Sequence, residues 1–258
     1  MSGKDHYYNK AKQEGYRSRA AYKLKQLDGA AELVSPGDTV VDLGAAPGGW
    51  LQVAAELAGP DGRVLGVDRQ RIDPVAAADG APVETLRADL TEAEAREAIR
   101  ERVGAADAVL SDMAPNVSGE YELDHARSVH LARQAMAVGL DVLAAGGDLA
   151  VKVFQGPDLA DLRADLEADF DHVRAVEPDA SRASSSEVYL VAKGRLTAPV
   201  RAGDELEVAI EDEGAEGDGV ARIDGFTLFV PGAEPGETVS VVVTDVKPRF
   251  GFAELVEA

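Results

Sequence analysis

The sequence predicts an α/β domain built on a mostly parallel sheet with an antiparallel pair of strands at one edge, followed by a small all-β barrel. Short, continuously apolar runs recur between segments of helical spacing, which is the pattern of parallel strands buried on both faces. Near residue 195 the composition changes to short strands separated by turns rich in Gly, Pro and acids. At 258 residues the chain is long enough for two domains, which we place at 1–194 and 195–258.

Charge is distributed very unevenly along the chain. The net charge is −21, yet residues 1–25 hold seven Lys or Arg against two acids. An acidic, lysine-poor composition is typical of adaptation to high salt, where self-repulsion is screened within a few Å. An acidic protein of a mesophile is the alternative. The sequence has no cysteine, which excludes disulfides, thiolate metal sites and a cysteine nucleophile, and we expect no metal site.

The apolar runs are too short for a membrane protein. None approaches the roughly 18 residues that a membrane helix needs, and the polar, basic beginning of the sequence lacks the apolar region of a secretory signal. We therefore expect a soluble, cytoplasmic protein that does not bind membranes, and we expect it to be a monomer.

Residues 1–28 form a basic arm that runs into a helix. Tyrosines alternate there with lysines and arginines, in the only basic segment of an acidic sequence. Cations interleaved with aromatic rings suit the phosphates and bases of RNA. A solvated helix face is the alternative interpretation.

The first strand, residues 39–43, ends in a loop of small residues that opens onto a helix at Trp50. Glycines in residues 44–49 allow the backbone to approach a ligand closely. The loop reads Asp-x-Gly-x-x-Pro-Gly-Gly from Asp42, which is not the dinucleotide fingerprint Gly-x-Gly-x-x-Gly. It resembles motif I of S-adenosylmethionine (SAM) methyltransferases. An acid at the strand end suits SAM, which is cationic and has no pyrophosphate.

Three further strands also close on acids. Residues 63–68 end at Asp68, residues 83–88 precede Asp89, and residues 105–110 precede Ser111 and Asp112. Ligands of open α/β sheets bind outside the carboxyl ends of the strands, so these acids are expected to face the same crevice as the glycine loop. Each acid alone is more often a helix cap.

A lysine stands within the next apolar strand. After a helix at residues 124–143, the strand at residues 148–154 contains Lys152 among apolar neighbours. A buried charge costs several kcal/mol unless it is paired, which favours a functional role over a structural one. The alternative is a lysine whose amine reaches solvent at the strand end.

The remaining elements complete the prediction. A helix at residues 159–170 is followed by strands at 171–177 and 188–193, whose short connection predicts the antiparallel pair at the sheet edge. Five short strands at 205–210, 219–223, 226–230, 238–246 and 252–256 predict the barrel.

Five motifs in residues 14–194 resemble the FtsJ/RlmE family of ribosomal RNA 2′-O-methyltransferases. They are the segments at residues 16–24, 41–50, 111–116, 151–156 and 181–189. The resemblance implies a Rossmann-like domain that transfers a methyl group from SAM to the ribose 2′-OH of a nucleotide, a uridine, in large-subunit ribosomal RNA. It places the family's catalytic tetrad on Lys23, Asp112, Lys152 and Glu187. It places the SAM contacts on Gly48, Trp50, Asp68, Asp89 and Asp112.

The C-terminal segment resembles the TRAM domain, an OB-like barrel of RNA-modifying enzymes. The resemblance lies in residues 217–222, 229–233 and 235–237. It implies RNA binding, although residues 195–258 carry five basic residues against fourteen acids. Lys247, Arg249 and Phe250 are close enough in sequence for a local RNA-binding patch.

Several alternatives stay open at this level. Lys152 could be a neutral general base or a charged group that orients the substrate, since nearby carboxylates favour an ammonium whereas burial and Lys23 oppose it. The RNA could be a tRNA. A nicotinamide oxidoreductase shares the fold but lacks its glycine fingerprint here, and a non-catalytic RNA chaperone would not need Lys152 or three strand-end acids.

Overall fold

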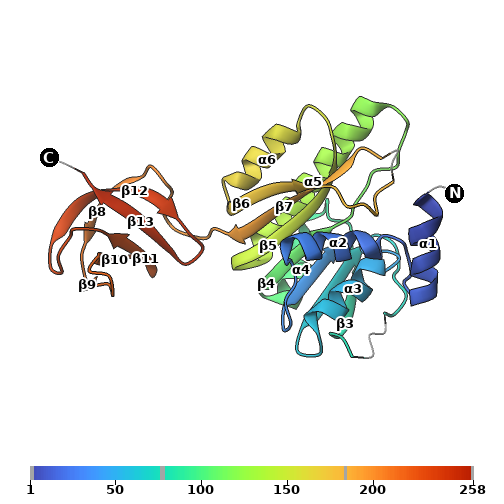
Figure 1. The fold of residues 1–258 in the computed structure, drawn as a ribbon, viewed down its shortest axis with the longest axis horizontal. Helices are drawn as coiled ribbons and strands as arrows, with labels where there is room; N and C mark the ends of the chain where they lie inside the picture. The colour runs from blue at the N-terminus through green and yellow to red at the C-terminus, as the bar shows by residue number, and fades with distance from the viewer. Residues whose placement is uncertain (1–2, 76–78, 183–184, 257–258) are drawn as a thin grey trace.

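The computed structural model describes residues 3–75, 79–182 and 185–256 and has two units, an α/β unit and an all-β unit (Figure 1). The first is a seven-stranded sheet in the order β3-β2-β1-β4-β5-β7-β6. Its strands are β1 (Thr39–Leu43), β2 (Arg63–Asp68), β3 (Val83–Arg87), β4 (Ala106–Ser111), β5 (Leu143–Phe154), β6 (Phe170–Val176) and β7 (Glu187–Arg195). Strands β1 to β5 pair in parallel, and β7 is antiparallel to both β5 and β6. The predicted fold class and the antiparallel pair at one edge are confirmed.

Helices cover both faces of this sheet. They are α2 (Ala21–Ala31), α3 (Gly49–Ala58), α4 (Ala93–Val103), α5 (Tyr121–Val142) and α6 (Leu159–Glu167), while α1 (Gly3–Glu14) packs against α2. One hydrophobic cluster joins α2 and α3 to the sheet, and a second joins α4, α5 and α6 to it. Small apolar side chains on β1, β4 and β5 fill both interfaces, as parallel strands buried on two faces require. The carboxyl ends of the central strands are left free to form a site.

The basic arm differs from the single helix that was expected. It forms α1 and α2 with a break at residues 15–20, where Gly15 adopts a left-handed φ of 80°. The break turns α2 onto α3, so that Leu24 and Leu27 are fully buried.

The second unit is a curled six-stranded sheet in the order β8-β12-β13-β11-β10-β9. Its strands are β8 (Glu205–Ala209), β9 (Asp212–Glu213), β10 (Gly219–Ile223), β11 (Phe226–Val230), β12 (Thr238–Val246) and β13 (Phe250–Leu255). The five predicted strands are present, and the short β9 is additional. Leu228, Val230 and Val241 lie at the centre of its own hydrophobic core.

The two units contact each other through the turn between β12 and β13. Lys247 Nζ lies 2.9 Å from a carboxylate oxygen of Asp171 on β6. Among the described residues, the helices are all too short or too polar to cross a membrane.

Candidate functional site

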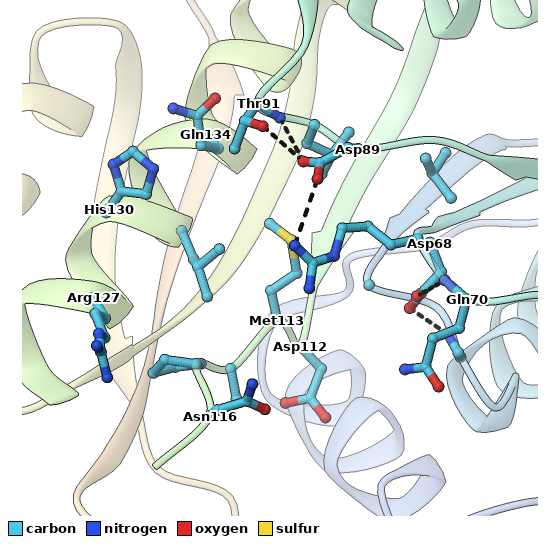
Figure 2. Close-up of a pocket in the computed structure, with 18 of the residues that line it drawn as sticks. Asp68, Gln70, Asp89, Thr91, Asp112, Met113, Asn116, Arg127, His130 and Gln134 are labelled. Atoms are coloured by element: carbon cyan, nitrogen blue, oxygen red, sulfur yellow. Dashed lines mark hydrogen bonds and ion pairs between the residues drawn. The ribbon is translucent and has the colours of Figure 1, made fainter. Parts of the chain in front are cut away.

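An open cleft of about 670 Å³ lies at the carboxyl ends of the central strands. Figure 2 shows Asp68, Asp89 and Asp112 around this cleft, with Arg127 and His130 of α5 on its other side. The structure therefore brings together the three strand-end acids that the sequence singled out. The other two residues expected to contact SAM, at positions 48 and 50, do not line the cleft.

Asp68, at the end of β2, holds the glycine loop in place. Its carboxylate accepts hydrogen bonds from the backbone N–H groups of Ala46 at 3.0 Å and Gln70 at 2.7 Å. One acid thus joins the loop after β1 to the loop after β2 at the edge of the cleft.

Asp89, after β3, is held by its own turn. Its carboxylate accepts hydrogen bonds from the backbone N–H and the hydroxyl of Thr91 and lies 3.5 Å from Arg69. The hydrogen bond from the Thr91 backbone is the main reason that the pKa of Asp89 lies below its usual range. The carboxyl is therefore a fixed anion at the cleft.

Asp42 on β1 is a buried acid that the sequence analysis did not include among the site residues. It is 1% exposed, and neither carboxylate oxygen has a hydrogen-bond partner among the residues that the structure describes. Burial, with the nearby charges of Asp112 and Asp68, raises the pKa of Asp42 well above its usual value. Its place as the first residue of Asp-x-Gly was the signal in the sequence.

The glycine loop is clamped from outside by Arg17. The guanidinium donates to the backbone carbonyls of Pro47 at 3.1 Å, Asp73 at 2.7 Å and Pro74 at 2.5 Å. A Cβ on Gly48, whose φ is 105°, would lie 2.9 Å from this guanidinium. The positive φ is what requires glycine at position 48. Arg17 is used within the protein instead of facing RNA.

Trp50 begins the helix after the loop but its indole points away from the cleft. The ring is 3% exposed and its N–H donates to the carbonyl of Ala20 at 2.7 Å. It packs against Tyr189 with ring centroids 5.9 Å apart. The side chain therefore joins the arm, α3 and β7, and only its backbone lies at the N-terminus of α3.

The four residues of the predicted tetrad lie together. Lys152 on β5 donates to a carboxylate oxygen of Asp112 at 2.7 Å and also to the Asp112 backbone carbonyl. The ammonium of Lys23 on α2 lies 3.6 Å from the same carboxylate oxygen and 2.7 Å from Glu187 on β7. Two cations and two carboxylates thus alternate in one cluster, and Asp112 belongs to both this cluster and the cleft.

The charges in this cluster are strongly coupled. Burial alone would raise the pKa of Asp112, but Lys152 and Lys23 outweigh it and hold the pKa below its usual range. The side chain of Lys152 is 6% exposed and that of Lys23 is 11% exposed. In such poorly hydrated surroundings each charge depends on its partners.

Tyr189 is a fifth member that sequence reasoning missed. Its hydroxyl donates to Asp112 at 2.5 Å, and the residue lies directly opposite Lys152 in the β5–β7 pair. Burial, followed by the charge of Asp112, raises the pKa of Tyr189 well above its usual value, so the hydroxyl remains a donor. The signal was the spacing of two from Glu187, which places both side chains on one face of a strand.

The segment after β5 is fixed by the first turns of α5. His125 contacts the carbonyl of Phe154 through Nδ1 at 2.9 Å and Asp158 through Nε2 at 3.1 Å. The hydroxyl of Ser128 accepts from the Phe154 backbone N–H at 3.0 Å. A Cβ on Gly156 would lie 2.4 Å from the imidazole, so glycine is required there. These contacts hold the end of the strand that carries Lys152.

The site as a whole can bind a cationic ligand and orient a hydroxyl group next to it. Asp68, Asp89 and Asp112 line the cleft, and three carboxyl side chains around one cleft fit a positively charged cofactor. Asp112 also belongs to the charged tetrad with Lys23, Lys152 and Glu187, so the tetrad lies directly beside the cleft. Within the described residues there is no group of three His, Cys, Asp or Glu side chains that could hold a metal ion. Of the motif at 181–189, residues 183–184 lie outside the described residues.

Comparison with known proteins agrees with this geometry. The family model described as FtsJ-like methyltransferase matches residues 16–195, and the TRAM domain model matches residues 199–256. A relative from Natronomonas pharaonis named "Ribosomal RNA large subunit methyltransferase E" is 68% identical over 257 residues, covering 100% of both chains. The protein of the same name from Halorubrum lacusprofundi is 62% identical, covering 100% of this chain and 95% of its own.

A solved structure supports the same conclusion. The crystal structure of a protein from Plasmodium falciparum named as a ribosomal RNA methyltransferase has a TM-score of 0.60 and 25% identity, and covers 70% of this chain and 98% of its own. The halophilic sources of the relatives match the acidic composition of this chain. The chain belongs to the FtsJ-like methyltransferase family and carries a TRAM domain after its methyltransferase domain.

Proposed function

We propose that this protein transfers a methyl group from SAM to the ribose 2′-OH of a nucleotide, a uridine, in large-subunit ribosomal RNA. The observation that carries the proposal is the position of Asp112, which both lines the cleft and binds the ammonium of Lys152 at 2.7 Å. A methyl donor in the cleft and a hydroxyl beside Lys152 would thus meet at one residue. The names of the full-length relatives support ribosomal RNA as the substrate.

The two family matches suggest which part of the chain carries which function. We assign methyl transfer to residues 1–194 and RNA binding to residues 195–258, and we propose that the protein acts as a monomer. The separate hydrophobic cores of the two units support this division.

SAM supplies a methyl group on a positively charged sulfur. Asp68 and Asp89, held by backbone N–H groups, would accept hydrogen bonds from the hydroxyls and amines of the adenosine part, and Asp112 would face the charged end. Gly48 and Trp50 do not line the cleft, so their contribution would come from the backbone N–H groups at the N-terminus of α3, which would favour the carboxylate of the methionine part.

The geometry of Lys152 defines how it can act on the hydroxyl. Two of its N–H groups point to the carboxylate and the carbonyl of Asp112, which fixes the direction of the remaining tetrahedral position. In the neutral amine that position is a lone pair that accepts the 2′-OH proton, and in the ammonium it is a third N–H that stabilises the developing negative oxygen. In both cases Asp112 orients Lys152, while Glu187 holds Lys23 towards the substrate.

A labelling experiment tests the type of reaction. Large-subunit ribosomal RNA is incubated with the protein and methyl-labelled SAM and is then hydrolysed with alkali. A 2′-O-methyl group blocks cleavage of the next phosphodiester, so we expect the label in dinucleotides. Label in mononucleotides would indicate methylation of a base and would overturn the proposed reaction.

Replacing Asp68 with alanine should weaken SAM binding by roughly 1–3 kcal/mol, because hydrogen bonds to a charged acceptor are lost. The variant also releases the backbone N–H of Ala46, so the glycine loop loses an anchor. Calorimetric titration with SAM measures the effect. The exposed Asp61 provides a control, since Asp61→Ala removes the same charge outside the cleft. Equal SAM affinity of the two variants would show that Asp68 does not contribute to SAM binding.

Replacing Asp42 with asparagine should stabilise the protein without SAM at pH 7 by about 1 kcal/mol or more, because a neutral amide neither carries a charge into the interior nor has to take up a proton on folding. The pKa of Asp42 is raised in the folded state, so this residue lowers the free energy of unfolding of the unaltered protein. The loss is absent below the unfolded pKa of about 3.9 and grows as the pH rises. The stability difference between the variant and the unaltered protein should therefore shrink as the pH falls towards 4. Urea unfolding at several pH values measures it, and a variant that is less stable at pH 7 would contradict the account.

A further inference from the structure

Arg17 joins two loops that follow different strands. Its guanidinium donates to the carbonyl of Pro47, in the loop after β1, and to the carbonyls of Asp73 and Pro74, in the segment after β2. One nitrogen, Nη1, serves both Pro47 and Asp73, and Nη2 serves Pro74. A guanidinium can make three such bonds at once because its N–H donors form a fixed, planar fork. We call these contacts the Arg17 clamp.

The same two loops are joined a second time by Asp68. Its carboxylate accepts hydrogen bonds from the backbone N–H groups of Ala46 and Gln70. Asp68, Ala46 and Gln70 all line the cleft, whereas Arg17 does not. An anion that binds N–H groups at the cleft and a cation that binds carbonyls outside it thus fix the two loops relative to each other.

The clamp also sets the direction of a peptide group at the start of α3. The C=O of Pro47 and the N–H of Gly48 belong to one peptide group, in which they point in opposite directions. Because Arg17 binds the carbonyl, the Gly48 N–H points away from the guanidinium. Such N–H groups at a helix N-terminus have no partner within the helix and favour an anion. The clamp therefore directs a donor that could bind the methionine carboxylate of SAM.

The helix after the glycine loop holds the backbone of Arg17 in turn. The Arg17 N–H donates to the side chain of Gln52 on α3 at 2.8 Å, and the Gln52 amide donates to the carbonyl of Gly15 at 3.0 Å. Ser18 packs against the same helix, since a Cβ on Gly49 would lie 2.3 Å from the Ser18 hydroxyl. The guanidinium thus extends from a fixed backbone, which reduces the entropy that it loses in binding the carbonyls.

We propose that Arg17 is a positioning residue for SAM, so that residues 15–20 of the basic arm are part of the cofactor site. The proposal deepens the proposed function and rests on SAM being the methyl donor. The alternative role for an arginine of the basic arm is to bind RNA phosphates. The two roles require different properties, because a phosphate contact needs a positive charge whereas the clamp needs the fork of the guanidinium.

Replacing Arg17 with lysine in the full-length protein separates the two roles, since it keeps the charge and removes the fork. We expect SAM affinity, measured by calorimetric titration without RNA, to fall about tenfold or more. The KM for SAM should rise by a similar factor, while kcat at saturating SAM changes little because the bonds between Lys152 and Asp112 are retained. Arg174→Lys is the matched control. The Arg174 guanidinium also donates to a backbone carbonyl, that of Ala30 on α2, and its loss should leave SAM affinity unchanged.

Two further measurements distinguish the clamp from a general loss of structure. Guanidinium ion at millimolar concentration should restore SAM binding to Arg17→Ala, because it can donate to the same carbonyls, and methylammonium should not restore it. Backbone hydrogen exchange without SAM should be faster at residues 44–50 in Arg17→Lys than in the unaltered protein, and unchanged there in Arg174→Lys. If Arg17→Lys fails to fold, Arg17→Gln takes its place in the titration, with the same expected loss.

The possible outcomes separate this proposal from the proposed function. Equal SAM affinity of Arg17→Lys and the unaltered protein would overturn the clamp, and so would an equal loss of affinity in Arg174→Lys or rescue by methylammonium. Weaker RNA binding of Arg17→Lys with unchanged SAM affinity would assign the residue to phosphates instead. Absence of SAM binding by the unaltered protein would overturn the proposed function together with the clamp.

Discussion

Replacing Lys152 with methionine should lower turnover by about 10² or more while SAM affinity changes little. Methionine preserves the length and packing of a side chain that is 6% exposed but removes the group that faces the hydroxyl. The carboxylate of Asp112 keeps two partners, Lys23 and Tyr189, so the cleft retains its shape. Single-turnover methylation of ribosomal RNA, alongside calorimetric titration with SAM, measures the two effects separately.

The matched control for this prediction is Lys193→Met. Lys193 lies on β7 and is bound to Asp148 and to the carbonyl of Glu32, away from the cleft. It should leave turnover per folded molecule unchanged. Near-normal turnover of Lys152→Met would show that Lys152 has no role in catalysis. The pH dependence of turnover in the unaltered protein then distinguishes a neutral base from a charged orienting group, because only the base must lose its proton first.

Replacing Asp112 with asparagine should have the second large effect, on both stability and turnover. The carboxylate lies 2.7 Å from Lys152 and 3.6 Å from Lys23, so its loss leaves two buried ammonium groups without their shared counterion. Removing one partner of a buried ion pair costs about 3–5 kcal/mol. Urea unfolding measures this cost, and turnover should fall as well because Lys152 is no longer oriented.

The pH dependence of that cost has a definite sign. The pKa of Asp112 is lowered in the folded state, so its stabilising contribution is complete above the unfolded pKa of about 3.9 and is lost as the pH falls through the folded pKa. The difference in stability between the two proteins should therefore narrow in acid. Asp148→Asn, which removes the partly buried carboxylate bound to Lys193 away from the cleft, is the control: turnover per folded molecule should stay normal. An Asp112→Asn protein with full turnover would contradict the account.

Residues at the ends of strands were the most predictable part of the molecule. Apolar runs precede Asp68 and Asp112, an alternating strand segment precedes Asp89, and parallel pairing brings the ends of these strands to one edge. The lysine in β5 was equally visible, because a charge within an apolar strand is costly.

Side chains that act within the protein were less predictable. Trp50 and Arg17 belong to family motifs, yet the indole binds Ala20 and the guanidinium binds three carbonyls. A motif gives the position of a residue but not the direction of its side chain, which depends on how α2 packs on α3. Tyr189 was missed for a related reason, since its partner Asp112 is 77 residues away in sequence and meets it only across the sheet.

Phe229, Phe250 and Phe252 of the second unit show the same limit, because their rings form one cluster only in the folded sheet. Phe229 is separated from Phe250 by 21 positions, and their contact depends on the parallel pairing of β11 with β13. The sequence analysis therefore selected Phe250 with its neighbouring cations and left out the two rings that complete the cluster.

Mass mapping of methylated ribosomal RNA tests the central claim most directly. The claim is that SAM binds in the cleft and that Lys152 acts on a ribose 2′-OH beside it. Large-subunit RNA is treated with SAM and either the unaltered protein or Lys152→Met, digested, and analysed by mass spectrometry. The account predicts one additional methyl group, on the ribose of a single uridine, formed by the unaltered protein and nearly absent with the variant. A methyl group on a base, or equal methylation by the two proteins, would contradict it.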